Sequence, residues 1–169
     1  YQPEKRNAVK LLAFFDVGGS MDPHIKICEE LFSACRTEFK NLEYFYFHTV
    51  PCESIWKHKR RRRNERVMTE DVLNKYSADY RIIFVGDATM APYEITNPGG
   101  SIEHWNEEAG GLWMKRMVDV YDKVIWLNPV PSDHWEYSAS VELTRSLVED
   151  NMFPLTIRGL EDSMAFLSK

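Results

Sequence analysis

Four short apolar runs, separated by helical patterns, constrain the fold of this chain more than any other feature. The runs are VKLLAFF (9–15), LEYFYF (42–47), YRIIFV (80–85) and DKVIWL (122–127). In the first of them apolar residues follow one another without alternation, as in a strand that is buried on both faces of a sheet. Between the runs, apolar residues recur at three- and four-residue steps, which is typical of amphipathic helices. The pattern predicts an α/β fold, with a Rossmann-like, mostly parallel central sheet and helices on both faces.

The remaining segments complete this prediction. Helices are expected at 23–39, 71–76, 105–120, 138–150 and 162–169, with a last short strand at 152–157. Pro51 interrupts the second run, and CESIW (52–56) then predicts one antiparallel strand at the edge of the sheet. Thr69 is expected to cap the helix that follows it. Residues 1–169 fit a single domain, since neither a repeat nor a linker is visible.

Composition limits the class of function. The chain has 26 acidic and 21 basic residues, a formal net charge of −5, which argues against a general nucleic-acid binder. No apolar stretch reaches the roughly 18 residues of a membrane span. Three scattered cysteines give no disulfide framework and suit the reducing cytoplasm. No secretory leader is visible. The chain begins with Tyr1 rather than methionine, so we expect a fragment or a processed form of a longer protein.

Two aspartates stand where apolar runs end. Asp16 follows the first run directly, and Asp87 follows the third run after one glycine. Ligands of parallel sheets bind beyond the carboxyl ends of the strands, where the strand order reverses. Two carboxylates at one edge repel each other unless a cation neutralises them. With hydroxyls from Ser20 and Thr69, they form a ligand set for Mg²⁺. Each aspartate alone is also a common turn residue, so the combination carries the prediction.

The same residues resemble the metal-ion-dependent adhesion site (MIDAS) of von Willebrand factor type A (vWA) domains. DVGGSM (16–21) resembles the D-x-S-x-S signature of that family, VMTEDVL (67–73) its threonine loop, and IIFVGDATM (82–90) the strand that ends in the last ligand. The resemblance covers nearly the whole chain and implies Mg²⁺, Mn²⁺ or Ca²⁺ as cofactor. The implied metal ligands are Asp16, Ser20, Thr69 and Asp87.

Gly18 departs from the family pattern, because it stands where the family supplies its first serine ligand. The signature therefore reads D-x-G-x-S. Water is a normal Mg²⁺ ligand and can fill the position of the missing hydroxyl. We expect a degenerate site with weakened metal affinity, in which water completes the coordination.

VIWLNPVP (124–131) and FPLTIRGLEDSMAFL (153–167) are most similar to the bacterial CoxE-like branch of the family. This resemblance implies a non-catalytic, protein-binding domain at the C-terminal end of a longer protein. Such domains present their metal to a carboxylate of a partner. The branch is paired with MoxR-type AAA+ ATPases in the maturation of proteins and metal cofactors. The implied role is a cytoplasmic adaptor between such an ATPase and a client protein.

Two further segments are expected to contact a partner near the carboxyl ends of the strands, where the metal site is predicted. One is the long loop at 88–103, and the other is the basic run KHKRRRRNER (57–66). The basic run fits an acidic protein surface, or a solvated loop that blocks pairing at the sheet edge. Nucleic acid is a weaker prediction, because no aromatic residues interleave the run. The candidate contacts are Tyr93, Glu94, Arg60, Arg61, Arg62 and Arg63.

Two alternative functions stay open. Asp16 and Asp87 also suit a metal-dependent phosphohydrolase, although Gly18 stands where aspartate-nucleophile phosphatases carry a second acid. The other alternative is a metal-free interaction module that uses the run at 57–66. The histidines show no zinc-site spacing, and a triad of Ser20, His48 and Asp87 lacks the G-x-S-x-G elbow. We therefore expect a binding domain rather than an enzyme.

Overall fold

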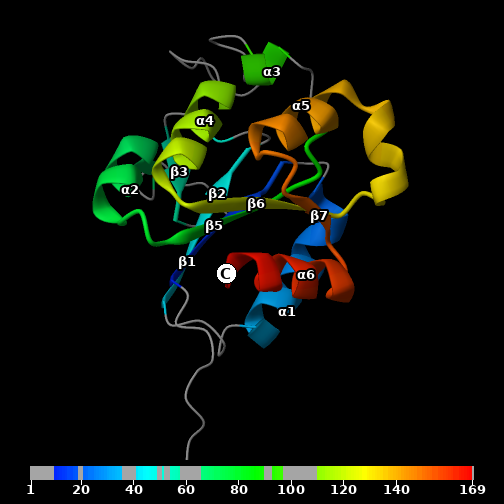
Figure 1. Cartoon of the computed structure of the whole chain (residues 1–169), viewed down its shortest axis with the longest axis horizontal. Helices are drawn as coiled ribbons and strands as arrows, with labels where there is room; N and C mark the ends of the chain where they lie inside the picture. The colour runs from blue at the N-terminus through cyan, green and yellow to red at the C-terminus, as the bar shows by residue number, and fades with distance from the viewer. Residues whose placement is uncertain are drawn as a thin grey trace, which may run out of the picture.

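The strands form one sheet, in the order β4-β3-β2-β1-β5-β6-β7 (Figure 1). The computed structural model describes residues 10–18, 21–35, 41–48, 51, 54–57, 66–89, 93–96 and 110–168. The strands are β1 (Lys10–Asp16), β2 (Asn41–Phe47), β3 (Ser54–Trp56), β4 (Arg66–Met68), β5 (Arg81–Val85), β6 (Lys123–Asn128) and β7 (Met152–Pro154). The helices are α1 (Asp22–Cys35), α2 (Thr69–Lys75), α3 (Tyr93–Thr96), α4 (Gly110–Val120), the 3₁₀ helix η4 (Ser132–Tyr137), α5 (Ala139–Leu147) and α6 (Ile157–Leu167).

The sheet is mostly parallel, which confirms the predicted α/β architecture. β1 pairs in parallel with β2 on one side and with β5 on the other, and β6 and β7 continue the parallel order. β3 runs antiparallel to β2, as CESIW predicted. A further strand, β4, pairs with the outer side of β3. The sequence did not predict β4, because its three residues RVM follow a highly charged run.

Alternate residues of β1 serve two hydrophobic cores. Leu11, Ala13 and Phe15 belong to one core, together with residues of α1 and α6. Leu12 and Phe14 belong to the other, which includes residues of α2, α4 and α5. Figure 1 shows the same division, with α1 and α6 on one side of the sheet and α2, α4 and α5 on the opposite side. The strands are therefore buried on both faces, as their continuous apolar runs predicted.

An aromatic cluster lies on the α4 and α5 face of the central strands. The rings of Phe14 and Phe84 are 5.2 Å apart, and Phe84 packs against Trp126 at 5.4 Å. Phe47 contacts both Phe84 and Trp126 edge-on. The contacts confirm that Trp126 is a core residue, and they form an apolar base beneath the carboxyl ends of the strands.

The start of α2 differs from the prediction. Thr69 is the first residue of the helix, the N-cap position is Met68, and no side chain caps it. The predicted capping role of Thr69 is therefore wrong. β4 leads directly into α2, and Thr69 is fully buried where the two elements meet.

The last helix, α6, begins at Ile157, five residues before the predicted start. Thr156 explains the difference, because its hydroxyl accepts the Gly159 N–H at 2.9 Å and caps the helix. This cap also ends β7 at Pro154, short of the predicted 157. Within the described part of the chain, no helix combines the length and apolarity that a membrane crossing requires.

Candidate functional site

The strand order reverses between β1 and β5. From β1 the chain builds β2, β3 and β4 on one side, and then returns to build β5, β6 and β7 on the other. Asp16 is the last residue of β1, and Asp87 lies two residues beyond the end of β5. Because β1 and β5 are parallel neighbours, both aspartates lie at the same edge of the sheet, as predicted. We call this the carboxyl edge.

Most of the buried polar side chains in the described residues gather at this edge. Asp16 ends β1 and Asn128 ends β6, Ser54 begins the antiparallel strand β3, and Thr69 and Asp87 follow β4 and β5. All five are at most 5% exposed. Burying polar groups costs free energy unless they find partners or a ligand. Their concentration marks the carboxyl edge as the place where this fold positions its chemistry.

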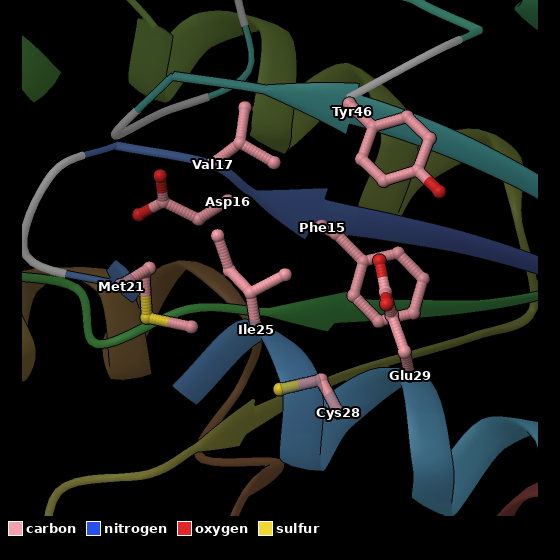
Figure 2. Close-up of a pocket in the computed structure, with 8 residues that line it drawn as sticks. All are labelled: Phe15, Asp16, Val17, Met21, Ile25, Cys28, Glu29 and Tyr46. Carbon is pink, nitrogen blue, oxygen red and sulfur yellow. The ribbon is translucent and has the colours of Figure 1, made fainter. Parts of the chain in front are cut away.

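Asp16 is held at the end of β1 by the backbone. Its Oδ1 accepts the Gly18 N–H at 2.8 Å. The ladder between β1 and β2 continues past it, since Val17 N–H donates to the Phe47 carbonyl at 2.9 Å. Figure 2 shows the carboxylate pointing along the strand toward its carboxyl end, away from the rings of Phe15 and Tyr46. Asp16 is therefore oriented by the turn that follows it.

The absence of a side chain at Gly86 leaves room for the side chain of Asp16. A Cβ atom at position 86 would lie 2.9 Å from Asp16 Cβ and 3.1 Å from the Trp126 ring. A side chain cannot fit there without moving β1 or β6, so glycine is required by the close approach. The sequence contained this glycine next to Asp87, but its role depends on a neighbouring strand.

The turn after β5 fixes Asp87. Its Oδ1 accepts the Thr89 N–H at 3.1 Å, and its backbone carbonyl accepts the Thr89 hydroxyl at 3.3 Å. Between them, Ala88 is fully buried and has a φ of 56°. A left-handed conformation is unfavourable for alanine and persists where the surrounding structure enforces it. The turn is thus built to hold the Asp87 carboxylate.

Two side chains of β6 hold this turn from the next strand. Trp126 Nε1 donates to the Gly86 carbonyl at 2.8 Å, and Asn128 Nδ2 donates to the Asp87 carbonyl at 3.1 Å. Asn128 Oδ1 in turn accepts the Val130 N–H at 2.9 Å. We call Trp126 and Asn128 the β6 pair. Sequence analysis placed Trp126 in a buried strand and overlooked Asn128, although Asn128 directly follows that apolar run.

His48 is a second residue of the edge to which sequence analysis assigned no role. It follows β2 directly, so it lies beside Val17 across the parallel ladder. Its Nε2 would lie 3.5 Å from a Cβ atom at position 18, which in turn would be 3.1 Å from Asp16 Oδ1. Sequence analysis weighed His48 only for zinc-site spacing and for a triad with Ser20 and Asp87. The useful signal was that His48 directly follows an apolar run, as Asp16 does.

The donor set suits a hard divalent cation only in part. Asp16, Thr69 and Asp87 offer carboxylate and hydroxyl oxygens at one edge, the chemistry that Mg²⁺ and Mn²⁺ accept. Among the described residues, however, no three carboxylate, imidazole or thiol groups lie close enough to hold a metal by themselves. A cation here would therefore be held by few protein ligands together with hydroxyls and water.

Several predicted site residues fall outside the described residues. These are Ser20 and the arginines at 60–63. Tyr93 and Glu94 belong to α3, but their side chains are likewise outside the description. The structure thus brings Asp16, Thr69, Asp87 and the backbone of Gly18 to the carboxyl edge.

A small, mostly apolar pocket lies beside Asp16, between α1 and the strands β1 and β2 (Figure 2). Burial raises the pKa of the Cys28 thiol in this pocket to about 12, with a smaller contribution from the nearby Glu29 carboxylate. Burial also raises the pKa of Tyr46. Cys28 and Tyr46 are therefore protonated at neutral pH and do not act as anionic nucleophiles. The pocket is lined by Phe15, Asp16, Val17, Met21, Ile25, Cys28, Glu29 and Tyr46.

Comparison with known proteins assigns no family. The chain matches no model of a protein family, and no curated protein sequence matches it significantly. The resemblance to vWA domains therefore rests on the motifs quoted above, and the carboxyl edge is characterised by its own geometry.

Proposed function

We propose that the carboxyl edge binds a divalent cation, Mg²⁺ or Mn²⁺, and through it a carboxylate of a partner protein. One observation carries the proposal: Asp16 and Asp87 are both buried at the reversal of strand order, and the Thr69 side chain is buried at the same edge. When bound, the cation supplies positive charge that offsets the two carboxylates and attracts an anionic ligand.

The residues of the edge are suited to holding charge in place. Asp16 lies above the aromatic cluster, where burying a carboxylate costs free energy that a counter-charge offsets. Its orientation is set by the Gly18 N–H, and that of Asp87 by the Thr89 N–H. Ligands held in fixed positions bind an ion more tightly than ligands that must be ordered on binding. The edge is therefore pre-organised for binding, and no step of covalent chemistry is required of it.

The resemblance to the CoxE-like branch supports a more specific role. In this proposal the domain is a non-catalytic adaptor, and its partners are a MoxR-type AAA+ ATPase and a client protein. The partner's acidic side chain docks at the carboxyl edge. The loop that contains α3 follows Asp87 along the chain and extends the contact. The basic run at 57–66 is not part of this contact, because it leaves β3 after Trp56 and rejoins β4 at Arg66, the strand ends that point away from the carboxyl edge.

The proposal is tested by binding to a purified MoxR-type AAA+ ATPase from the same organism, measured by biolayer interferometry in Mg²⁺. We expect Asp16→Asn to weaken binding about tenfold or more, because it removes one charge from the proposed cation site at nearly constant size. Asp122→Asn is the matched control. Asp122 is exposed at the amino end of β6, on the opposite edge of the sheet, where it pairs with Arg81.

Three results would contradict parts of this proposal. Equal binding by wild type and Asp16→Asn would remove the carboxyl edge from the interaction. No binding by the wild type would remove the ATPase as partner. Hydrolysis of an aryl phosphate by the wild type, lost in Asp16→Asn, would replace the proposal with a phosphohydrolase.

A further inference from the structure

The imidazole of His48, which directly follows the neighbouring strand β2, lies next to Gly18. A side chain at position 18 would start 3.1 Å from Asp16 Oδ1 and 3.5 Å from His48 Nε2. The imidazole edge formed by Nε2 and Cδ2 faces this point, since Cδ2 lies 3.6 Å from it. A Cβ atom on residue 18 would therefore contact both the Asp16 carboxylate and the imidazole. His48 Nε2 thus lies beside the residue that the resemblance identifies as a metal ligand.

The backbone holds His48 in this place. β1 and β2 pair in parallel along their whole length, with Asp16 opposite Phe47. The bond from Val17 N–H to the Phe47 carbonyl extends the pairing beyond Asp16. His48 and Gly18 thus leave neighbouring strands in adjacent register. Their proximity follows from the pairing of β1 with β2.

We infer that His48 is a metal ligand of the carboxyl edge and takes the place of the hydroxyl that Gly18 lacks. This inference rests on the proposed cation site. In this site Asp16 binds the metal through a carboxylate oxygen and His48 binds it through Nε2. The Thr69 hydroxyl is the third protein ligand. Asp87 binds through a water molecule. Among the described residues no three carboxylate, imidazole or thiol groups lie close enough to hold a metal by themselves, so the proposed site needs hydroxyl and water ligands beside Asp16 and His48.

An imidazole ligand changes the metal that the site selects. Mg²⁺ prefers oxygen ligands, whereas imidazole nitrogen suits the later divalent metals, whose affinities rise along the Irving–Williams order. A mixed nitrogen and oxygen site therefore favours a transition metal over Mg²⁺. Among the ions that the resemblance implies, the structure points to Mn²⁺.

Electron spin echo envelope modulation of the Mn²⁺-loaded protein tests this inference, because the method detects a nitrogen atom bound to the metal. We expect a directly coordinated ¹⁴N signal in the wild type that is absent in His48→Gln. Calorimetry should show roughly tenfold weaker Mn²⁺ binding in His48→Gln, with a smaller change for Mg²⁺. His134→Gln is the control, since His134 is exposed and pairs with Asp133.

The possible outcomes separate the two proposals. Mn²⁺ binding without a ¹⁴N signal would overturn the role of His48 and leave the cation site intact. A ¹⁴N signal that persists in His48→Gln would also overturn it. If no Mn²⁺ binds to the folded wild type, both the cation site and the role of His48 are wrong. Circular dichroism of each variant establishes that it is folded.

Discussion

Two glycines, Gly18 and Gly86, lie next to Asp16 at the carboxyl edge, and the missing side chain has a different consequence at each position. Gly86 is required, because a Cβ atom there would press into Asp16 and the Trp126 ring. Gly18 is different. Its φ is not in the left-handed range, and the closest contact of an added Cβ atom is 3.1 Å. Position 18 can therefore accept a small side chain after shifts of a few tenths of an ångström, and the absence of a hydroxyl there is a property that mutation can reverse.

We expect Gly18→Ser to raise Mg²⁺ affinity about tenfold, which corresponds to roughly 1.4 kcal/mol, because the serine hydroxyl offers Mg²⁺ the oxygen ligand that it prefers, in place of the His48 imidazole. Gly18→Ala adds the same Cβ atom without the hydroxyl and should leave the affinity unchanged or lower. Isothermal titration calorimetry with MgCl₂ compares the two variants. Equal affinities for serine and alanine would show that position 18 contributes no ligand.

At the scale of elements, β6 controls the turn that carries Asp87. The β6 pair donates to two successive carbonyls, those of Gly86 and Asp87, and residues two apart on a strand face the same side. Asn128 is fully buried and also accepts from Val130, so it links the end of β6 to the turn after β5. The position of the Asp87 carboxylate thus depends on a strand that contributes no ligand itself.

Asn128→Ala should lower the free energy of unfolding by about 1–3 kcal/mol, because it leaves buried backbone groups without their partners. It should also weaken Mn²⁺ binding, since the Asp87 turn loses its support. Urea denaturation and calorimetry measure the two effects. Thr144→Val is the control: Thr144 is buried on α5, and in the described part of the chain its hydroxyl makes no hydrogen bond. Unchanged Mn²⁺ affinity in folded Asn128→Ala would contradict the positioning role.

The elements that could be predicted from the sequence are those with a strong apolar period. The four long central strands were located to within a residue or two, because their burial on both faces leaves continuous apolar runs. β4 was missed because a strand of three residues is too short to show an alternating apolar pattern. The cap at Thr156 was missed because the helix was predicted to begin later, at residue 162. Local patterns therefore define the framework but not its short connections.

The candidate site was predictable to the same degree. Asp16 and Asp87 could be found because each ends an apolar run, and the parallel sheet brings such ends together. His48, Gly86 and Asn128 could not be assigned roles, because their contacts depend on which strands are neighbours. The aspartate positions are local information, whereas the roles of these three residues are properties of the sheet order.

At the scale of the whole molecule, the two helical layers leave the carboxyl edge as the place where buried polar side chains gather. The apolar residues of the central strands are enclosed by α1 and α6 on one face and by α2, α4 and α5 on the other. β1 and β6 end at this edge in Asp16 and Asn128, and His48 and Asp87 lie just beyond β2 and β5. In the described part of the chain, this edge therefore differs chemically from the apolar interior of the sheet, and the proposed cation site lies there.

An anomalous difference map from crystals grown with millimolar Mn²⁺ tests this account most directly. We predict one strong peak at the carboxyl edge, at metal–ligand distance, roughly 2.0–2.3 Å, from an oxygen of Asp16 and from His48 Nε2. A peak bound by Asp16 and hydroxyl oxygens alone would keep the cation site but remove His48 from it. The absence of a peak beside Asp16, in crystals where the edge is open to solvent, would contradict the central claim that this edge binds a metal ion.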